Sequence, residues 1–243
     1  FIEEARRYAG GDYLTALFKG DRLPPQERAA VAKRLSAFTG LAEDYLIKAN
    51  LRVSLGQFNV ELLRSKGLTS GRIDARFTGY TRNLLSETAE GDPEGPAVGG
   101  AFTALLNVYN QNELKFGRGK TYKTSSGGGG WNWTRLPTAR QGAAARGGGY
   151  PSAPNALADL LQAMITNPNL LVQVENGYYD MATPFFATEI TMDHLGLRPE
   201  MLDRIKHNYY EAGHMMYLQD ASRVALKNNV AAFIDKATRR QAP

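Results

Sequence analysis

The sequence predicts an α/β fold, and its C-terminal third is expected to contain a parallel sheet. Apolar residues recur at helical spacing through residues 1–66. From about residue 155 the pattern becomes helix, strand, helix, strand, helix, which is the chain order of parallel strands joined by crossover helices. A stretch with ten glycines, residues 117–154, separates these two parts.

The segments before the glycine-rich stretch are expected to be mostly helical. Residues 23–38 carry two prolines where a helix would begin, followed by apolar residues at helical spacing. Residues 54–67 repeat this spacing, and Gly67 is a stop signal. Three further segments are predicted to be a short extended piece, a loop and a helix, at 72–79, 87–100 and 101–114 respectively.

Five elements are predicted after the glycine-rich stretch. Asn155 is suited to cap a helix, and the apolar face of that helix consists of Leu157, Leu160, Leu161 and Met164. Short apolar runs predict strands at 170–174 and 205–210, and the Thr-Pro pair at 183–184 is suited to open a helix between them. The last helix is predicted to start at Asp220. Its inner face is expected to consist of Val230, Phe233, Ile234 and Ala237.

Composition narrows the chemistry that is open to the chain. Of the 243 residues, 43% are hydrophobic and 22% are charged, and no apolar run approaches a membrane span, so we expect no membrane segment. The absence of cysteine excludes disulfides, cysteine-type zinc sites and a cysteine nucleophile. His194, His207 and His214 share no helical spacing, and we expect neither a metal site nor a cofactor. The first residue is Phe1 rather than Met, which suggests a processed or partial chain and leaves the compartment open.

The net charge of +5 is concentrated in one segment. Between Glu113 and Asp159 there is no acidic residue, and seven basic residues occur there, namely Lys115, Arg118, Lys120, Lys123, Arg135, Arg140 and Arg146. Such a segment is suited to bind a polyanion, but it is equally typical of a basic surface loop. We favour the surface loop, with no nucleic-acid partner. Its glycine content predicts a mobile loop that is pinned at Trp131 and Trp133.

Two chemically capable side chains follow the two predicted strands near the C-terminus. Asp180 comes after the first strand and His214 after the second, 34 residues later. Functional groups gather beyond the carboxyl ends of parallel strands, so the two side chains are expected to meet at one sheet edge. A carboxylate beside a histidine fixes the tautomer of the ring and stabilises the imidazolium. Gly213 is expected to form a tight turn that presents the ring. On spacing alone, an aspartate that caps a helix or forms a turn, and a packed or solvated histidine, are the commoner interpretation.

The residues around this pair resemble a known family. The segments "NGYYDMATPFFATEITMDHLGL" (176–197) and "YYEAGHMMYL" (209–218) resemble the acid and histidine segments of the serine carboxypeptidases, particularly their bacterial members. The likeness extends back through "GRIDARFTGY" (71–80) to the helical start and covers nearly the whole chain, with 118–149 as the weakest part.

The resemblance implies roles for particular residues. Asp180 would be the acid of a Ser-His-Asp triad and His214 its general base. The flanking side chains are expected to help wall the substrate site, and these are Tyr178, Tyr179, Met215 and Met216.

The family fold is an α/β-hydrolase sheet with a helical insertion over the active site. By this resemblance, residues 1–150 are a mainly helical cap insertion that ends in the basic glycine-rich loop (117–149). Residues 151–243 are then the C-terminal part of the sheet with its helices. The family also implies a secreted or periplasmic location.

The family's nucleophile is a serine in a G-x-S-x-G elbow upstream of the insertion. No serine of this chain has glycine two positions before and two positions after it. Ser126 comes closest, with Gly128 after it but Thr124 before it. The nucleophile is therefore expected on a missing N-terminal part or on a partner chain. We expect this chain alone to be inactive.

Three hypotheses of function remain open on the sequence. The first is a serine-type carboxypeptidase acting on peptides, with this chain supplying the acid and the base. The second is an acyltransferase of the same family. The third is a non-catalytic binding or lid fragment that uses the basic glycine-rich loop as its contact surface. A G-x-S-x-G sequence after a strand in upstream coding sequence would favour an enzyme, and formation of a homo-oligomer is left open.

Overall fold

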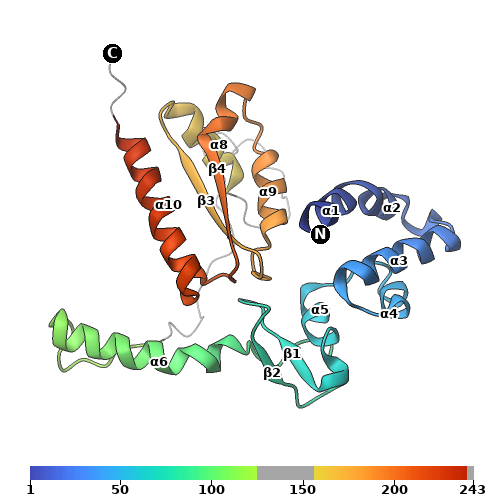
Figure 1. Cartoon of the computed structure of the whole chain (residues 1–243), viewed down its shortest axis with the longest axis horizontal. Coiled ribbons are helices and arrows are strands. Elements are labelled where there is room, and N and C mark those ends of the chain that lie inside the picture. The colour runs from blue at the N-terminus through green and yellow to red at the C-terminus, as the bar shows by residue number, and fades with distance from the viewer. Residues whose placement is uncertain (125–155, 240–243) are drawn as a thin grey trace, which may run out of the picture. The chain divides into compact units, whose positions relative to one another are not determined.

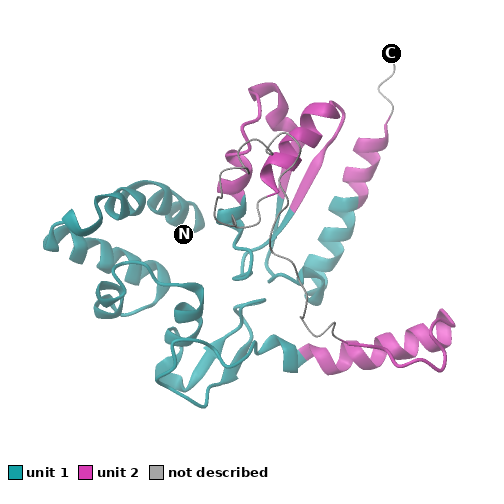
Figure 2. Ribbon diagram, turned by 180° about the vertical axis from the view of Figure 1, so that it is seen from behind, with its two compact units in different colours: residues 1–97, 175–188, 208–230 teal, residues 98–174, 189–207, 231–243 magenta. Residues whose placement is uncertain are grey.

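The computed structural model describes residues 1–124 and 156–239 of the chain. Within these residues the fold is mixed, with predominantly helical structure and two small two-stranded sheets (Figure 1). The chain divides into two compact units that each draw on several stretches of sequence (Figure 2). Unit 1 consists of 1–97, 175–188 and 208–230, and the remaining residues form unit 2.

Unit 1 begins with short helices that pack around a small apolar core. The helices are α1 (Ile2–Tyr8), α2 (Leu14–Lys19), α3 (Pro25–Thr39), α4 (Glu43–Lys48) and α5 (Leu55–Glu61). The core consists of six buried residues from these helices and the turns between them, namely Ala16, Leu23, Ala32, Leu41, Leu46 and Leu51. The helix predicted over 23–38 is confirmed by α3, which has Pro25 in its first turn and ends at Gly40 with φ of 75°.

A short antiparallel sheet follows α5. The Ser54 hydroxyl accepts from the Gln57 N–H, and the Gln57 side chain accepts from the Ser54 N–H, which forms a capping box at the start of α5. The helix predicted over 54–67 is shorter than expected, because α5 ends at Glu61. Gly67, with a φ of 69°, instead follows the separate 3₁₀ turn Arg64–Lys66. Strand β1 (Leu68–Ser70) then pairs with β2 (Thr78–Tyr80). The extended piece predicted over 72–79 is only partly right, because β2 begins at residue 78.

Helix α6 (Glu94–Val108) starts earlier than the sequence predicted. The loop predicted over 87–100 is wrong from Glu94 onward. The Asp92 carboxylate accepts a hydrogen bond from the Glu94 N–H at 3.3 Å, and Pro96 lies in the first turn, where its missing N–H removes no helical hydrogen bond. Pro96 therefore occupies the one part of a helix that tolerates proline, whereas Gly99 and Gly100 lie further inside α6.

The predicted order of elements after residue 155 is confirmed. The observed elements are α8 (Leu157–Thr166), β3 (Val172–Gly177), α9 (Phe185–Asp193), β4 (Ile205–Tyr210) and α10 (Asp220–Thr238). Strand β4 and the start of α10 match the prediction, whereas β3 lies further along the chain than 170–174. Polar β3 residues are accommodated because they bond to β4: the Asn208 side chain donates to Glu175, and Asn176 donates to the Asn208 carbonyl.

The inner face predicted for α10 is wrong. Val230 is 37% exposed and Ile234 is 52% exposed. Within unit 1 the helix instead buries Ser222, and its Ala225 and Leu226 pack against a buried cluster consisting of Tyr210, Ala212 and Met216. Apolar residues lie on more than one side of this helix, so the apolar pattern did not define its rotation.

Several predictions concern residues outside the described ranges. These are the greater part of the basic glycine-rich loop, with Trp131 and Trp133, and the helix cap at Asn155. The boundary predicted near residue 150 also falls there and stays a prediction. No helix among the residues that the structure describes is both long and apolar enough to cross a membrane.

Candidate acid–base site

Two loops of unit 1 leave neighbouring strands side by side. We call residues 178–183 the acid loop and residues 211–215 the histidine loop. The Tyr178 N–H donates to the Tyr210 carbonyl and the Tyr179 N–H to the Ala212 carbonyl, both at 3.0 Å. Since both partners advance in the same chain direction, the two backbones run parallel here. The loops therefore follow the carboxyl ends of parallel strands, where functional side chains gather.

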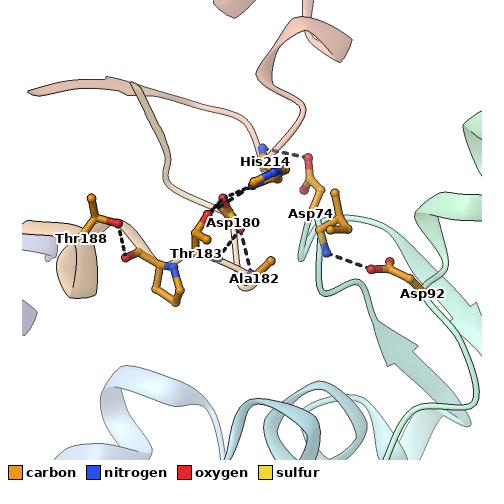
Figure 3. A network of polar contacts seen from close by, with 10 residues as sticks. Asp74, Asp92, Asp180, Ala182, Thr183, Thr188 and His214 are labelled. Atoms are coloured by element: carbon orange, nitrogen blue, oxygen red, sulfur yellow. Dashed lines mark hydrogen bonds and ion pairs between the residues drawn. The ribbon is translucent and has the colours of Figure 1, made fainter. Parts of the chain in front are cut away.

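The structure brings Asp180 and His214 together, as the strand order predicts. Asp180 Oδ2 lies 2.8 Å from His214 Nδ1 (Figure 3). Asp180 is only 5% exposed, whereas the His214 side chain is 50% exposed. A buried carboxylate thus holds one edge of a ring whose other edge is open to water.

The backbone and side chain of the acid loop fix the Asp180 carboxylate. Its Oδ1 accepts hydrogen bonds from the N–H groups of Ala182 and Thr183, both at 2.8 Å, and its Oδ2 accepts from the Thr183 hydroxyl at 2.6 Å. Three donors inside one short loop hold the carboxylate plane before any ligand arrives. Such preorganisation is what an orienting carboxylate needs.

The geometry assigns a tautomer to His214. An ionised carboxylate only accepts hydrogen bonds, so Nδ1 carries the proton and Nε2 keeps a free lone pair. Nε2 has no hydrogen-bond partner in the part of the chain that the structure describes. The ring is therefore arranged to accept a proton at Nε2 while Asp180 stabilises the imidazolium that results.

Thr183 is a residue whose role the sequence did not predict. It was expected to open a helix, and α9 does begin two residues later. Its hydroxyl, however, donates to Asp180 and lies 3.2 Å from His214 Nδ1. The only sequence signal for this role was the Asp-x-x-Thr spacing of Asp180 and Thr183, which is typical of a side chain that bonds to the backbone three residues later.

Two glycines allow the loops to approach closely. A Cβ atom at Gly177 would lie 2.2 Å from the Gly213 carbonyl oxygen, and a Cβ at Gly213 would lie 2.4 Å from Asp74 Cβ. Gly213 has no positive φ, so the tight turn predicted for it is not the reason for the glycine. The reason is the lack of space beside its Cα.

The cavity beside the acid loop is aromatic. It has a volume of about 470 Å³, and its walls include Tyr178, Tyr179 and Phe185. The Tyr178 ring stacks on Tyr209 with a centroid distance of 5.6 Å, and the Tyr179 hydroxyl donates to Glu211 at 3.0 Å.

The structure places the predicted methionines differently from the tyrosines. Met216 is buried against Tyr210 and Ala212 and so contributes to packing, and Met215 is partly buried. Neither methionine lines the aromatic cavity. The substrate roles of the tyrosines and the methionines stay predictions.

One buried acid near the pair lacks hydrogen-bond partners. Glu94 is 1% exposed, and neither carboxyl oxygen has a partner among the described residues. Burial, together with the nearby charges of Asp92 and Asp74, raises the pKa of Glu94. Within the described ranges, no group of three or more His, Asp or Glu side chains is placed to hold a metal ion.

Comparison of the chain with protein-family models, with curated proteins and with solved structures found no match. The functional argument therefore depends on the geometry of the site and on the residues that form it.

Proposed function

We propose that this chain supplies the acid and the base of a serine-type carboxypeptidase with an α/β-hydrolase fold. The observation that carries the proposal is the contact between buried Asp180 and half-exposed His214, with 2.8 Å between Oδ2 and Nδ1. A packed structural histidine would not need its outer nitrogen free. A catalytic base does.

In the proposed reaction Nε2 of His214 accepts the proton of a serine hydroxyl as the serine oxygen bonds to the carbonyl carbon of the last peptide bond. Asp180 stabilises the imidazolium. The proton then passes from Nε2 to the leaving amine as the carbon–nitrogen bond breaks, which releases the C-terminal residue and leaves an acyl-enzyme. A water molecule, deprotonated by the same nitrogen, hydrolyses the ester and restores the serine.

One sequence resemblance and one structural observation support this function over other uses of an acid–histidine pair. The segments 176–197 and 209–218 are those whose residues resemble serine carboxypeptidases, a likeness that no family model or curated protein matched. The aromatic cavity beside the acid loop is suited to an apolar part of a peptide. The serine and the oxyanion donors are expected on another part of the enzyme or on a partner chain, so the 243-residue chain alone should be inactive.

The experiment is a peptide assay of the native protein, including any chain that purifies with it. Mass spectrometry of N-blocked peptides should show loss of one C-terminal residue at a time. Asp180→Asn should lower kcat by about 10⁴-fold, because the amide favours the wrong tautomer of the ring. His194→Gln is a matched control, since His194 is exposed and, among the described residues, its side chain bonds only to the Ile190 carbonyl of the preceding helix α9. No release of C-terminal residues would contradict the proposal, and transfer of the acyl group to an added alcohol or amine in place of water would favour the acyltransferase.

A further inference from the structure

A five-residue segment of unit 1, Arg72–Arg76, forms hydrogen bonds with both loops of the site. We call it the bridging segment. On the acid loop it bonds on either side of Asp180: the Ala75 N–H donates to the Tyr179 carbonyl at 2.9 Å, and the Met181 N–H donates to the Arg72 carbonyl at 3.1 Å. The backbone before Asp180 and the backbone after it are thus both attached to this segment.

The same segment holds the histidine loop at three points. The His214 N–H donates to the Ile73 carbonyl at 2.8 Å, and the Gly213 N–H donates to Asp74 Oδ2 at 3.0 Å (Figure 3). The Arg76 guanidinium donates to the Glu211 carbonyl at 2.8 Å. Two successive N–H groups, ending with that of His214 itself, are therefore bonded to the bridging segment.

Two charged side chains of the bridging segment, those of Asp74 and Arg76, form a bidentate pair. Arg76 Nε donates to Asp74 Oδ1 at 3.0 Å and Nη2 to Oδ2 at 2.6 Å, and the Arg76 N–H adds a bond to Oδ1. Burial alone would raise the pKa of Asp74, but the hydrogen bonds and charge of Arg76, with the Gly213 N–H, together lower the pKa of that carboxyl. Both oxygens of the buried Asp74 carboxylate are thus hydrogen-bonded. Oδ1 accepts from the N–H and Nε of Arg76, and Oδ2 accepts from Nη2 of Arg76 and from the Gly213 N–H.

The bridging segment is itself held by contacts with Asp92 and Tyr179. The Asp92 carboxylate accepts hydrogen bonds from the N–H groups of Arg72 and Ile73, at 3.2 and 3.0 Å. The Arg76 guanidinium also lies over the Tyr179 ring, 4.9 Å from its centroid. The segment is therefore a rigid spacer between the two loops, and it has few ways to adjust if one of its bonds is lost.

We propose that Asp74 and Arg76 are positioning residues that set the distance and orientation between Asp180 and His214. Among the described residues, neither forms a hydrogen bond with the Asp180 carboxylate or the His214 ring, and both act through the backbone of the histidine loop. Only the expected effect on peptide hydrolysis rests on the proposed function. The arrangement of the two side chains is a physical property that can be measured without activity.

The first measurement is proton and carbon NMR of the histidine rings in the native protein. Only three histidines occur in the chain, and His194→Gln and His207→Gln assign the remaining signal to His214. The Nδ1 proton of His214 should appear far downfield and exchange slowly with water, because it is hydrogen-bonded to Asp180.

Two substitutions test the hydrogen-bonded pair of Asp74 and Arg76, which we call the clamp. Asp74→Asn removes the charge and one acceptor of the bidentate pair. Arg76→Lys keeps the charge but removes the planar fork, so it separates geometry from electrostatics. In both variants we expect the downfield proton to broaden or vanish, as it should in Asp180→Asn. Arg82→Lys is the matched control, because Arg82 is exposed and forms only a long ion pair with Glu90.

The second measurement is steady-state peptide hydrolysis by the same proteins. A misplacement of the ring by about 1 Å is expected to lower kcat by about 10²-fold. KM should change less than kcat, because neither Asp74 nor Arg76 lines the aromatic cavity itself, and Arg76 reaches it only through the Tyr179 ring. If Asp74→Asn fails to fold by circular dichroism, Arg76→Lys decides alone.

The outcomes separate the two proposals. Loss of the downfield proton in folded Arg76→Lys, with Arg82→Lys unchanged, supports the clamp whether or not the wild-type protein hydrolyses peptides. If the wild-type protein hydrolyses no peptide, only the carboxypeptidase proposal fails. An unchanged downfield proton in folded Arg76→Lys would overturn the clamp, whatever the activity.

Discussion

Gly213 is the position at which one added methyl group should disturb the acid–histidine pair most. A Cβ atom there would lie 2.4 Å from Asp74 Cβ, 2.6 Å from Asp74 Cγ and 2.6 Å from the Ile73 carbonyl oxygen. Carbon atoms in contact normally stay about 3.5–4.0 Å apart. Gly213→Ala must therefore separate the histidine loop from the bridging segment by about 1 Å.

The expected cost has a structural and a functional component. Overpacking of this size typically destabilises a fold by about 1–3 kcal/mol. Moving the loop by about 1 Å also lengthens the 2.8 Å contact between Asp180 and His214, which abolishes that hydrogen bond. The downfield Nδ1 proton of His214 should then be lost, and any peptidase activity of the native protein should fall by about 10²-fold.

The assay is urea unfolding followed by far-ultraviolet circular dichroism, together with the histidine NMR signals. Gly95→Ala is the matched control, because a Cβ at Gly95 in α6 meets nothing within 4 Å. It should leave stability unchanged or raise it by up to about 1 kcal/mol, since alanine favours a helix over glycine. A Gly213→Ala protein with wild-type stability and an intact downfield proton would refute the reasoning.

Three other substitutions test the surrounding structure. Glu94→Gln should raise the free energy of unfolding at pH 7. The increase is about 1.4 kcal/mol for each tenfold difference in proton affinity between folded and unfolded Glu94. This increase should vanish below about pH 4, where Glu94 is protonated in both states. The sign follows because the raised pKa of Glu94 means that the unfolded chain loses the proton first as the pH rises. Tyr210→Phe should cost about 1–3 kcal/mol in urea unfolding, because the hydroxyl bonds to Glu175 at 2.5 Å and to Asn229 at 2.8 Å. Burial raises the pKa of Tyr210 to about 12, so this cost should be the same from pH 6 to 9. Ser54→Ala removes the capping box of α5 and should cost about 1 kcal/mol.

Each of these predictions has a clear contrary result. A Glu94→Gln gain that is equally large at pH 4 and pH 7 would show that ionisation is not its cause. A neutral Tyr210→Phe would mean that the buried hydroxyl contributes nothing net. For Ser54→Ala, the matched control is Ser65→Ala, outside the capping box, and equal stabilities of the two variants would argue against the cap.

The placement of Asp180 and His214 could be predicted because it depends on chain order alone. Parallel strands end at one edge, so residues just after two such strands meet without any knowledge of side-chain packing. The starts of α3 and α10 could also be predicted, since Pro25 suits a first helical turn and the negative charge of Asp220 suits the N-terminus of a helix.

What the sequence did not predict depends on partners far away in the chain. Asp74 accepts its bond from Gly213 across 139 residues, and no local pattern marks either residue for the other. The rotation of α10 was mispredicted for a related reason: its inner side includes the buried Ser222 and also Asn229, whose amide donates to the Tyr210 hydroxyl, and neither residue carries an apolar signal. Both cases depend on tertiary contacts that no local pattern marks.

The central claim is that His214 and Asp180 serve a serine that lies outside these 243 residues. The most direct measurement is labelling of the native protein with a fluorophosphonate probe, which reacts with activated serines, followed by intact mass and peptide mapping. The account predicts one labelled serine outside this chain, and it predicts that His214→Gln abolishes the label while His194→Gln does not. A native species of only these 243 residues that takes no label, or a label that persists in His214→Gln, would contradict it.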